Sequence, residues 1–198
     1  MPSILIATRN RDKAREFQEL LSDWPIVIKT LDDFQHVGEI EEDADSLEGN
    51  ALKKAREAYR ATGVPAIADD TGLEVGYLNG APGVHSARYA GPRATYADNC
   101  KKLLREMRGV PPRRRGARFR CVIAFVQGEE EFRLMEGICR GVITEAPRGK
   151  NGFGYDPVFL PTRRRATFGE MTPAEKNAVS HRALAIAELR KMLPTLLP

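Results

Sequence analysis

A short apolar segment that runs directly into two acidic residues is the feature of this sequence that most limits its fold. In AIADDTGLEV, residues 66–75, the run AIA suits a buried strand, and Asp69 and Asp70 follow at once. Adjacent like charges raise each other's pKa unless a cation or hydrogen bonds compensate. A simple turn is the alternative, but a turn needs only one Asp. The doublet therefore indicates a cation site, after which Gly72 is expected to turn the backbone away.

The order of apolar and polar segments predicts a mixed α/β sheet. β-Prone runs alternate early with segments whose apolar residues recur at helical spacing, and two long β-prone runs follow. We expect strands at residues 3–8, 25–31, 66–69, 118–127 and 131–144. We expect helices at residues 9–21, 46–62, 95–108 and 173–192. Ser46 or Asp45 should cap the second helix, and the polar segments 35–46, 109–118 and 147–157 should be loops.

Length and composition place the chain among ordinary globular proteins. Its 198 residues suit one domain, and 42% hydrophobic and 29% charged residues are typical of a protein in water. The net charge of +4 favours anionic ligands without demonstrating a nucleic-acid partner. The longest apolar run, residues 121–126, is too short to span a bilayer, and three cysteines without CxxC spacing fit reduced thiols. We therefore expect a cytoplasmic protein with no membrane partner.

The segment TRNRDK, residues 8–13, is a candidate anion site. A strand that ends at Thr8 and leads into a helix bearing Lys13 can direct backbone N–H groups and an ammonium group at a phosphate. It lacks the glycines of a Walker loop or a dinucleotide fingerprint. An ordinary helix N-cap surrounded by surface charge is the alternative.

Acidic and basic residues before and within the second helix could complete such a site. Magnesium needs only one or two protein carboxylates when substrate phosphates supply other oxygens, so Glu42 with Asp70 would suffice. Solvated loop charge is the alternative for the acids at residues 39–45. Either Lys53 or Lys54 could hold a phosphate tail.

Two later segments could recognise a base. GFGYDP, residues 152–157, offers aromatic side chains and one carboxylate, although a tight loop with Phe153 or Tyr155 in the core would look the same. KNAVSHR, residues 176–182, is expected to place Lys176, His181 and Arg182 close together on one helix. The arginine runs at 113–115 and 163–165 carry no RNA-binding signature, and we expect exposed loop charge there.

Together these segments resemble one family. TRNRDK, EEDADSLEGNALKKA, ADDTGL, GAPGVHSARYAG, GFGYDPVF and EKNAVSHR occur in the order and spacing of the inosine triphosphate pyrophosphatases, which hydrolyse dITP, ITP and XTP to the monophosphate and pyrophosphate. The resemblance implies one domain over residues 1–198, with an elongated mixed β-sheet flanked by helices and two lobes around a central active-site cleft. It also implies a homodimer that uses Mg²⁺.

The resemblance also assigns roles to residues of this chain. Asp70 is implied to be the proton acceptor and a metal ligand, and Glu42 the second metal ligand. The substrate-binding residues that it implies are Thr8, Arg9, Asn10, Arg11, Asp12, Lys13, Lys54, Thr71, Phe153, Gly154, Tyr155, Asp156, Lys176, His181 and Arg182.

Two single positions and one short segment depart from the family pattern. Arg9 stands where the family usually has glycine, so its side chain either crowds or assists the phosphate loop. Thr71 replaces the usual serine and keeps the hydroxyl. LEGN, residues 47–50, departs modestly and is expected to affect only packing. The alternatives to this function are a pyrophosphatase for modified pyrimidine triphosphates and a non-enzymatic nucleotide- or RNA-binding module.

Overall fold

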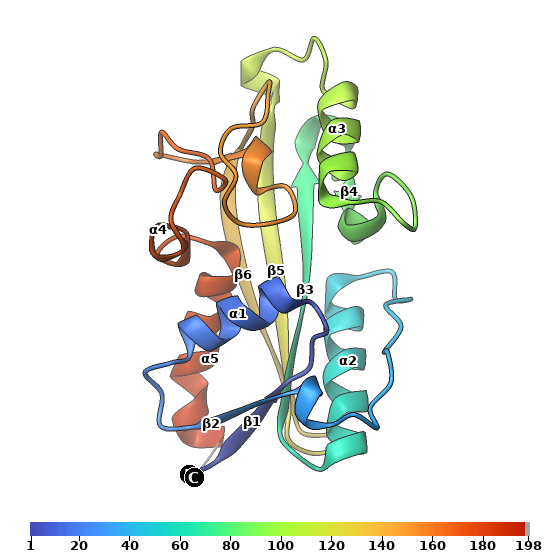
Figure 1. The fold of residues 1–198 in the computed structure, drawn as a ribbon, viewed down its shortest axis with the longest axis vertical. Coiled ribbons are helices and arrows are strands. Elements are labelled where there is room, and N and C mark those ends of the chain that lie inside the picture. Colours follow the sequence, from blue (N-terminus) through green and yellow to red (C-terminus); the bar gives the residue numbers. More distant parts are fainter. Residues whose placement is uncertain (197–198) are drawn as a thin grey trace. The chain divides into compact units, whose positions relative to one another are not determined.

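The computed structural model describes residues 1–196, and its elements form the mixed α/β sheet expected from the sequence (Figure 1). The helices are α1 (Arg11–Leu20), α2 (Leu47–Thr62), α3 (Tyr96–Glu106), α4 (Pro173–Asn177) and α5 (His181–Leu196). The strands are β1 (Ser3–Ile6), β2 (Val27–Thr30), β3 (Ala66–Val75), β4 (Pro82–Gly83), β5 (Gly116–Val126), β6 (Phe132–Ile143) and β7 (Phe159–Pro161). Among these residues, no helix combines the length and apolarity needed to cross a bilayer.

The described strands form one seven-stranded sheet with parallel and antiparallel pairs. The order is β2-β1-β3-β5-β6-β7, and β4 pairs with β3 off this path. β1 runs parallel to β2 and to β3, with Leu5 opposite Ala66, whereas β7 is antiparallel to β6. Because β1 and β3 are parallel neighbours with Ile6 opposite Ile67, the polar residues that follow β1 lie beside the part of β3 that carries the doublet Asp69–Asp70.

The chain divides into two compact units, each with a core of its own. Unit 1 comprises residues 1–70, 121–137 and 182–198, and unit 2 comprises residues 71–120 and 138–181. In unit 1, Phe17 of α1 and Leu189 of α5 pack with the strands, and α2 and α5 lie on either side of them (Figure 1). In unit 2, the ring of Phe159 lies 4.7 Å from Phe119 and 5.2 Å from Phe168, centre to centre.

The ends of α2 follow the sequence rules. The hydroxyl of Ser46 accepts the amide of Gly49 at 3.1 Å, which satisfies one N–H group of the first turn. Gly63 ends the helix in the left-handed conformation at φ +67°. Leu47, Asn50, Ala51, Lys54, Ala55 and Ala58 are the buried residues of this helix. The buried face therefore includes an amide and an ammonium group among its apolar residues.

The expected turn after Asp70 is wrong. β3 continues for ten residues, from Ala66 to Val75, and carries the acidic pair in its middle. Gly72 serves close packing instead, because a Cβ atom there would lie 2.7 Å from the carbonyl oxygen of Gly83 on β4. The glycine lets two backbones approach within unit 2, and the strand holds both carboxylates on regular backbone.

The single C-terminal helix expected from Pro173 is also wrong. Pro173 does begin α4, and Thr172 caps it by accepting the amide of Glu175 at 3.3 Å, but α4 ends at Asn177. α5 begins only at His181. Lys176 therefore lies on a different helix from His181 and Arg182, and the three do not share one helix face.

Arg115 departs from the expectation of an exposed arginine run. It is 5% exposed, and its guanidinium group donates to four backbone carbonyls of unit 2. The acceptors are Ile143 at 2.6 Å, Thr144 at 2.7 Å, Met107 at 2.8 Å and Val110 at 3.3 Å. One side chain thus joins the end of α3 to the end of β6, while Arg113 and Arg114 are exposed as expected.

We predict that Arg115→Met lowers the free energy of unfolding by at least about 3 kcal/mol, because it removes charge-assisted hydrogen bonds and leaves buried carbonyls without donors. Arg113→Met, two positions away and exposed, should change it by less than about 0.5 kcal/mol. Urea unfolding of both variants measures the difference. Equal stability of the two would contradict the role given to Arg115.

Candidate functional site

Asp69 is the hub of a buried network of charges in unit 1. Its Oδ2 atom lies 3.1 Å from Nζ of Lys13 and accepts a hydrogen bond from Nη2 of Arg182 at 2.8 Å. The carboxylate of Asp69 is fully buried, and the side chain of Lys13 is 14% exposed. The first acid of the doublet therefore joins α1 and α5 to the middle of β3.

Glu16 extends the network beyond Arg182. Nη1 of Arg182 donates to the carboxylate of Glu16, which is 7% exposed on the helix that also carries Lys13. Arg182 itself is 1% exposed. Two carboxylates thus hold one buried guanidinium, as burial of a charge requires.

The electrostatics of this network favour the charged forms. Burial opposes ionisation of Asp69, yet the charges of Lys13 and Arg182 hold its pKa well below the ordinary value. Burial also disfavours the charge of Lys13, but the carboxylates of Asp69, Asp70 and Glu42 together outweigh this and raise the pKa of Lys13. Asp69 and Lys13 are therefore both ionised at neutral pH.

Asp70 has the opposite electrostatic character. Burial raises the pKa of its carboxyl group, Lys13 and Lys54 act to lower it, and the nearby charge of Glu42 raises it further. Nδ2 of Asn50 donates to Oδ2 of Asp70 at 2.9 Å and fixes the orientation of the carboxylate. Oδ1 of Asn50 accepts the amide of Ala44 at 2.9 Å, which ties the acidic loop to the same place.

The structure distinguishes Lys54 from Lys53. Nζ of Lys54 donates to the backbone carbonyl of Asp69 at 2.6 Å and to the carboxylate of Glu42, so this lysine links the acidic loop to β3. Lys53 lies on another face of α2 and pairs with Asp43 at 2.8 Å. Of the two lysines, only Lys54 belongs to the cluster around Asp70.

The donors around Asp70 fit a hard divalent cation. Glu42 and Asp70 are carboxylates close enough for the charge of one to raise the pKa of the other, and a bound cation would relieve that repulsion. Oxygen ligands of this kind suit Mg²⁺, which keeps waters or takes substrate phosphates as its other ligands. No group of three or more His, Cys, Asp or Glu side chains in the described part of the chain could enclose a metal.

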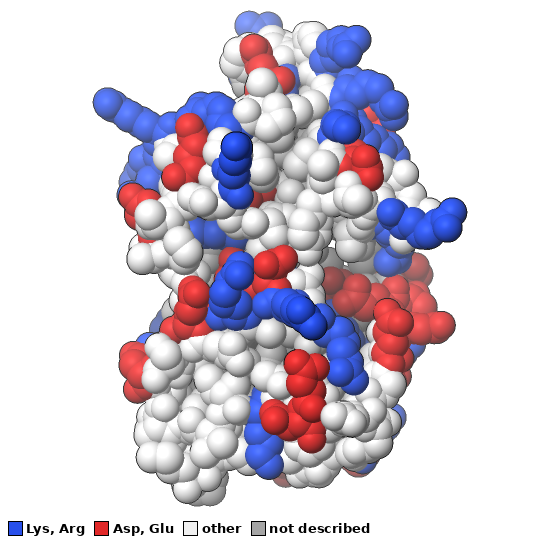
Figure 2. Space-filling model, viewed as in Figure 1, with Lys and Arg blue, Asp and Glu red and all other residues white. Residues whose placement is uncertain are grey.

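The segment TRNRDK forms the N-cap that the sequence also allowed. Oδ1 of Asn10 accepts the amides of Asp12 at 3.0 Å and Lys13 at 3.2 Å, and Thr8 accepts the amide of Asn10 at 3.2 Å. Asp12 pairs with Arg15 at 3.1 Å, and Arg11 is exposed. Figure 2 shows basic side chains over α1 and acidic ones over the loop before α2. The cap places Lys13 against Asp69.

Arg9 is directed toward the segment after β2. Its Nη2 atom donates to the carbonyl of Val37 at 2.5 Å, and its Nη1 atom lies 3.5 Å from a carboxylate oxygen of Asp32. The arginine that replaces glycine thus braces a loop. A contact between Arg9 and substrate stays a prediction.

In unit 2, Asp156 organises the loop GFGYDP. Its Oδ2 atom accepts the amide of Phe153 at 2.8 Å and a hydrogen bond from Nζ of Lys176 at 2.6 Å. Gly152 has φ +71°, and a Cβ atom there would lie 2.0 Å from Oδ2 of Asp156. Nζ of Lys176 also lies 4.6 Å from the centre of the Phe153 ring. Glycine and carboxylate together set this turn.

The aromatic residues of the loop have different positions. Tyr155 is 4% exposed and belongs to the core of unit 2, which is the core position that the sequence allowed for Phe153 or Tyr155. Phe153 is half-buried, and Gly154 has φ +61°. His181 is 3% exposed, and its ring stacks on Phe119 at 4.5 Å. Thr71 directly follows Asp70 on β3 and is half-buried.

Two residues of the unit 1 network were missed from the sequence. Asn50, expected to affect only packing, is 1% exposed and orients Asp70, and Glu16 holds Arg182. A signal for Asn50 was available: it precedes Lys54 by one helical turn, so two polar residues share a face with buried alanines. Polar groups on a buried helix face indicate a site.

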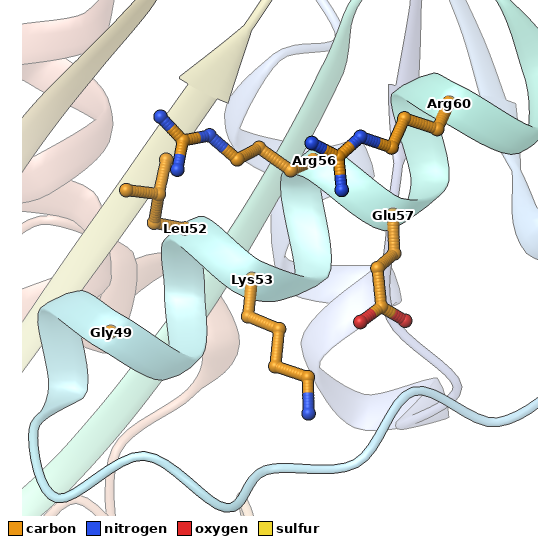
Figure 3. A pocket seen from close by; sticks show the side chains of 6 residues that line it. All are labelled: Gly49, Leu52, Lys53, Arg56, Glu57 and Arg60. Atoms are coloured by element: carbon orange, nitrogen blue, oxygen red, sulfur yellow. The ribbon is translucent and has the colours of Figure 1, made fainter. Parts of the chain in front are cut away.

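A hollow of about 250 Å³ on the outer side of α2 is not the site (Figure 3). It is lined by Gly49, Leu52, Lys53, Arg56, Glu57 and Arg60. Arg60 is paired with Glu129 at 2.7 Å, and the guanidinium of Arg56 lies over Phe132 at 4.8 Å. Its cations are thus engaged by other side chains, and its lining includes none of the residues around Asp70.

The fold and the cluster around Asp70 define an α/β protein with a buried centre of carboxylates and lysines. The chain belongs to the Ham1 family, whose model matches residues 4–192. The chain is similar to a dITP/XTP pyrophosphatase of Desulfotalea psychrophila, with 47% identity over 197 residues that cover 100% of this chain and 87% of the relative. A Bacillus licheniformis protein of the same name is 47% identical over 98% of each chain.

Solved structures agree with the fold. A HAM1 protein from Coxiella burnetii superposes with a TM-score of 0.89 at 43% identity, covering 98% of this chain and 100% of the other. A Ham1 protein from Staphylococcus aureus gives 0.86 at 34% identity and 98% coverage of both. The family resemblance seen in the sequence is therefore confirmed.

We predict that the two acids of the doublet respond differently to the same change. Asp69→Asn removes the partner of two buried cations and should lower the free energy of unfolding by about 3–5 kcal/mol. Asp70→Asn removes a charge that burial and Glu42 disfavour, so stability should fall by less than about 1 kcal/mol or rise. Guanidinium unfolding of the matched pair measures both, and equal losses would refute the division of roles.

Proposed function

We propose that this protein is a nucleoside triphosphate pyrophosphatase that hydrolyses aberrant purine nucleotides such as dITP, ITP and XTP to the monophosphate and pyrophosphate. The observation that carries the proposal is the cluster of Asp70, Glu42, Lys13 and Lys54 around the middle of β3 in a Ham1 family chain. Relatives with 47% identity over nearly the whole chain bear the name of this activity, which supports it. Removal of such nucleotides keeps them out of DNA and RNA.

The chain's own residues can perform the hydrolysis. Asp70, held by Asn50, accepts the proton of a water molecule whose oxygen attacks the α-phosphorus, and the bond from that phosphorus to the pyrophosphate oxygen breaks. Lys13 and Lys54 place positive charge beside the leaving pyrophosphate. Magnesium, held by Glu42 and Asp70 when bound, supplies further neutralisation of phosphate charge. Thr8 and Asn10 keep the start of α1 in place.

Recognition of the purine is assigned to residues of unit 2 together with the start of α5. Phe153 presents an aromatic face, and Asp156 with Lys176 fixes its loop. A keto oxygen at the six-position accepts hydrogen bonds, whereas the amino group of adenine donates them. Backbone donors around His181 would therefore be satisfied by hypoxanthine or xanthine and opposed by adenine. The guanidinium of Arg182, which was expected to read the base as well, is held by Asp69 and Glu16.

Other properties implied by the resemblance belong to the same proposal. We infer a homodimer, a cytoplasmic location, and neither a nucleic-acid nor a membrane partner. The principal ligand is then the triphosphate with its Mg²⁺ ion.

Pyrophosphate release from dITP tests the reaction. We predict release that stops when EDTA removes divalent ions and returns with excess Mg²⁺, and Asp70→Asn should lower kcat by about 10²–10⁴-fold because the proton acceptor is lost. Asp43→Asn is the matched control: it neutralises an exposed carboxylate of the same acidic loop and should leave kcat within twofold. Loss of only a few-fold in Asp70→Asn would remove Asp70 from its role.

A nucleotide panel tests the choice of base. We predict that kcat/KM for dITP and XTP exceeds that for dATP by at least about 30-fold, since two donors left unpaired by adenine cost about 1–3 kcal/mol each. Dephosphorylation of dTTP or UTP as fast as dITP would favour a pyrimidine triphosphate enzyme instead. Salt-sensitive RNA binding without pyrophosphate release would favour a binding module.

A further inference from the structure

The motif GAPGVHSARYAG, residues 80–91, has no part in the reaction as described, yet its centre is buried. β4, Pro82–Gly83, lies antiparallel to β3, with Gly83 opposite Leu73. The segment then turns, and Ser86 begins a short 3-10 helix. Ser86 is 8% exposed. A buried serine in a polar connecting segment indicates a specific set of hydrogen bonds.

Ser86 makes three hydrogen bonds, all within unit 2. Its hydroxyl accepts the amide of Leu73 at 2.9 Å and donates to the carbonyl of Gly83 at 2.6 Å. Its own backbone carbonyl accepts the hydroxyl of Tyr155 at 2.8 Å. Burial raises the pKa of Tyr155, so this hydroxyl remains a donor at neutral pH. One residue thus connects β3, two positions beyond Thr71, with the loop GFGYDP.

α3 holds both ends of this connection. Asn99 accepts the amide of Ala90 at 2.8 Å and donates to the carbonyl of Ala87 at 3.0 Å, which fixes the segment after Ser86. Sγ of Cys100 lies 3.3 Å from the carbonyl oxygen of Gly154, next to Tyr155. The segment and the loop therefore rest against neighbouring residues of one helix.

We propose that Ser86 is a positioning residue for substrate recognition: its hydroxyl fixes β3 beside Thr71, and its carbonyl fixes Tyr155, so that the loop Phe153–Asp156 is held at a set distance from that strand. The proposal rests on the proposed function, because its effect is read in nucleotide binding. The chemical step belongs to Asp70, whose orienting hydrogen bond to Asn50 lies in unit 1. Loosening the connection should therefore weaken binding and spare turnover.

Two variants cut the connection at its two ends. Ser86→Ala removes the acceptor for Leu73, and Tyr155→Phe removes the donor to the Ser86 carbonyl. Each should raise KM for ITP by about 5–10-fold, the value of one buried hydrogen bond, while kcat stays within twofold. The double variant should raise KM no further than the larger single effect, because either cut already releases the loop. Tyr77→Phe, which removes the hydroxyl of an exposed tyrosine of unit 2, should leave KM unchanged.

Hydrogen exchange separates positioning from a general loss of structure. In Ser86→Ala the amide of Leu73 should exchange several-fold faster, and in Tyr155→Phe it should not. Unchanged KM in both single variants, a fall in kcat at constant KM, or effects that multiply in the double variant would each overturn the proposal. If Ser86→Ala does not fold, Tyr155→Phe decides by the same division between KM and kcat. A wild-type protein that releases no pyrophosphate would refute the proposed function, and Leu73 exchange would still test the connection.

Discussion

The ion pairs of Asp69 are the interaction on which the rest of unit 1 depends. A fully buried carboxylate is tolerated only with partners, and Asp69 has them in Lys13 at 3.1 Å and Arg182 at 2.8 Å. These contacts join α1 and α5 to β3, since Lys13 and Arg182 each lie at the start of a helix. These ion pairs between the helices and β3 belong to Asp69, the first acid of the doublet. One acid holds the fold, and the other presents a carboxyl group whose pKa is raised by burial and by Glu42.

Local physics explains which parts of the fold could be predicted. Ser46 and Gly63 bound α2 as expected because capping depends only on adjacent residues, and β1 and β2 were found from their apolar runs. The turn predicted after Asp70 is absent because β3 continues there, and Gly72 instead allows close packing against the backbone carbonyl of Gly83, which is a neighbour in space. Burial of Arg115 by carbonyls of two separate elements was equally out of reach. Each failure is a tertiary contact that overrides a local preference.

The site shows the same limit. The acidic doublet, Glu42 and the two candidate lysines could be identified from their residue types. Whether Lys53 or Lys54 belongs to the cluster depends on the rotation of α2 about its axis. The buried alanines could have settled this, because Lys54 shares their face and Lys53 does not. The bond of Arg182 to Asp69 spans 113 positions and has no local signature. The sequence could therefore identify the charged residues of the site but could not show which of them form pairs.

The distribution of charge adds a reason for a cation at this site. Unit 1 has 13 Lys and Arg against 20 Asp and Glu, a net charge of −7, and unit 2 has 18 against 7, or +11, which together give the +4 of the chain. Under the proposed function, a triphosphate at Asp70 would therefore meet a unit of its own sign. The nearest lysines already form ion pairs, Lys13 with Asp69 and Lys54 with Glu42. Part of their positive charge is therefore balanced by protein carboxylates. If the proposed function holds, a divalent ion bound by Glu42 and Asp70 would supply positive charge here, and binding it would relieve the repulsion between these two acids.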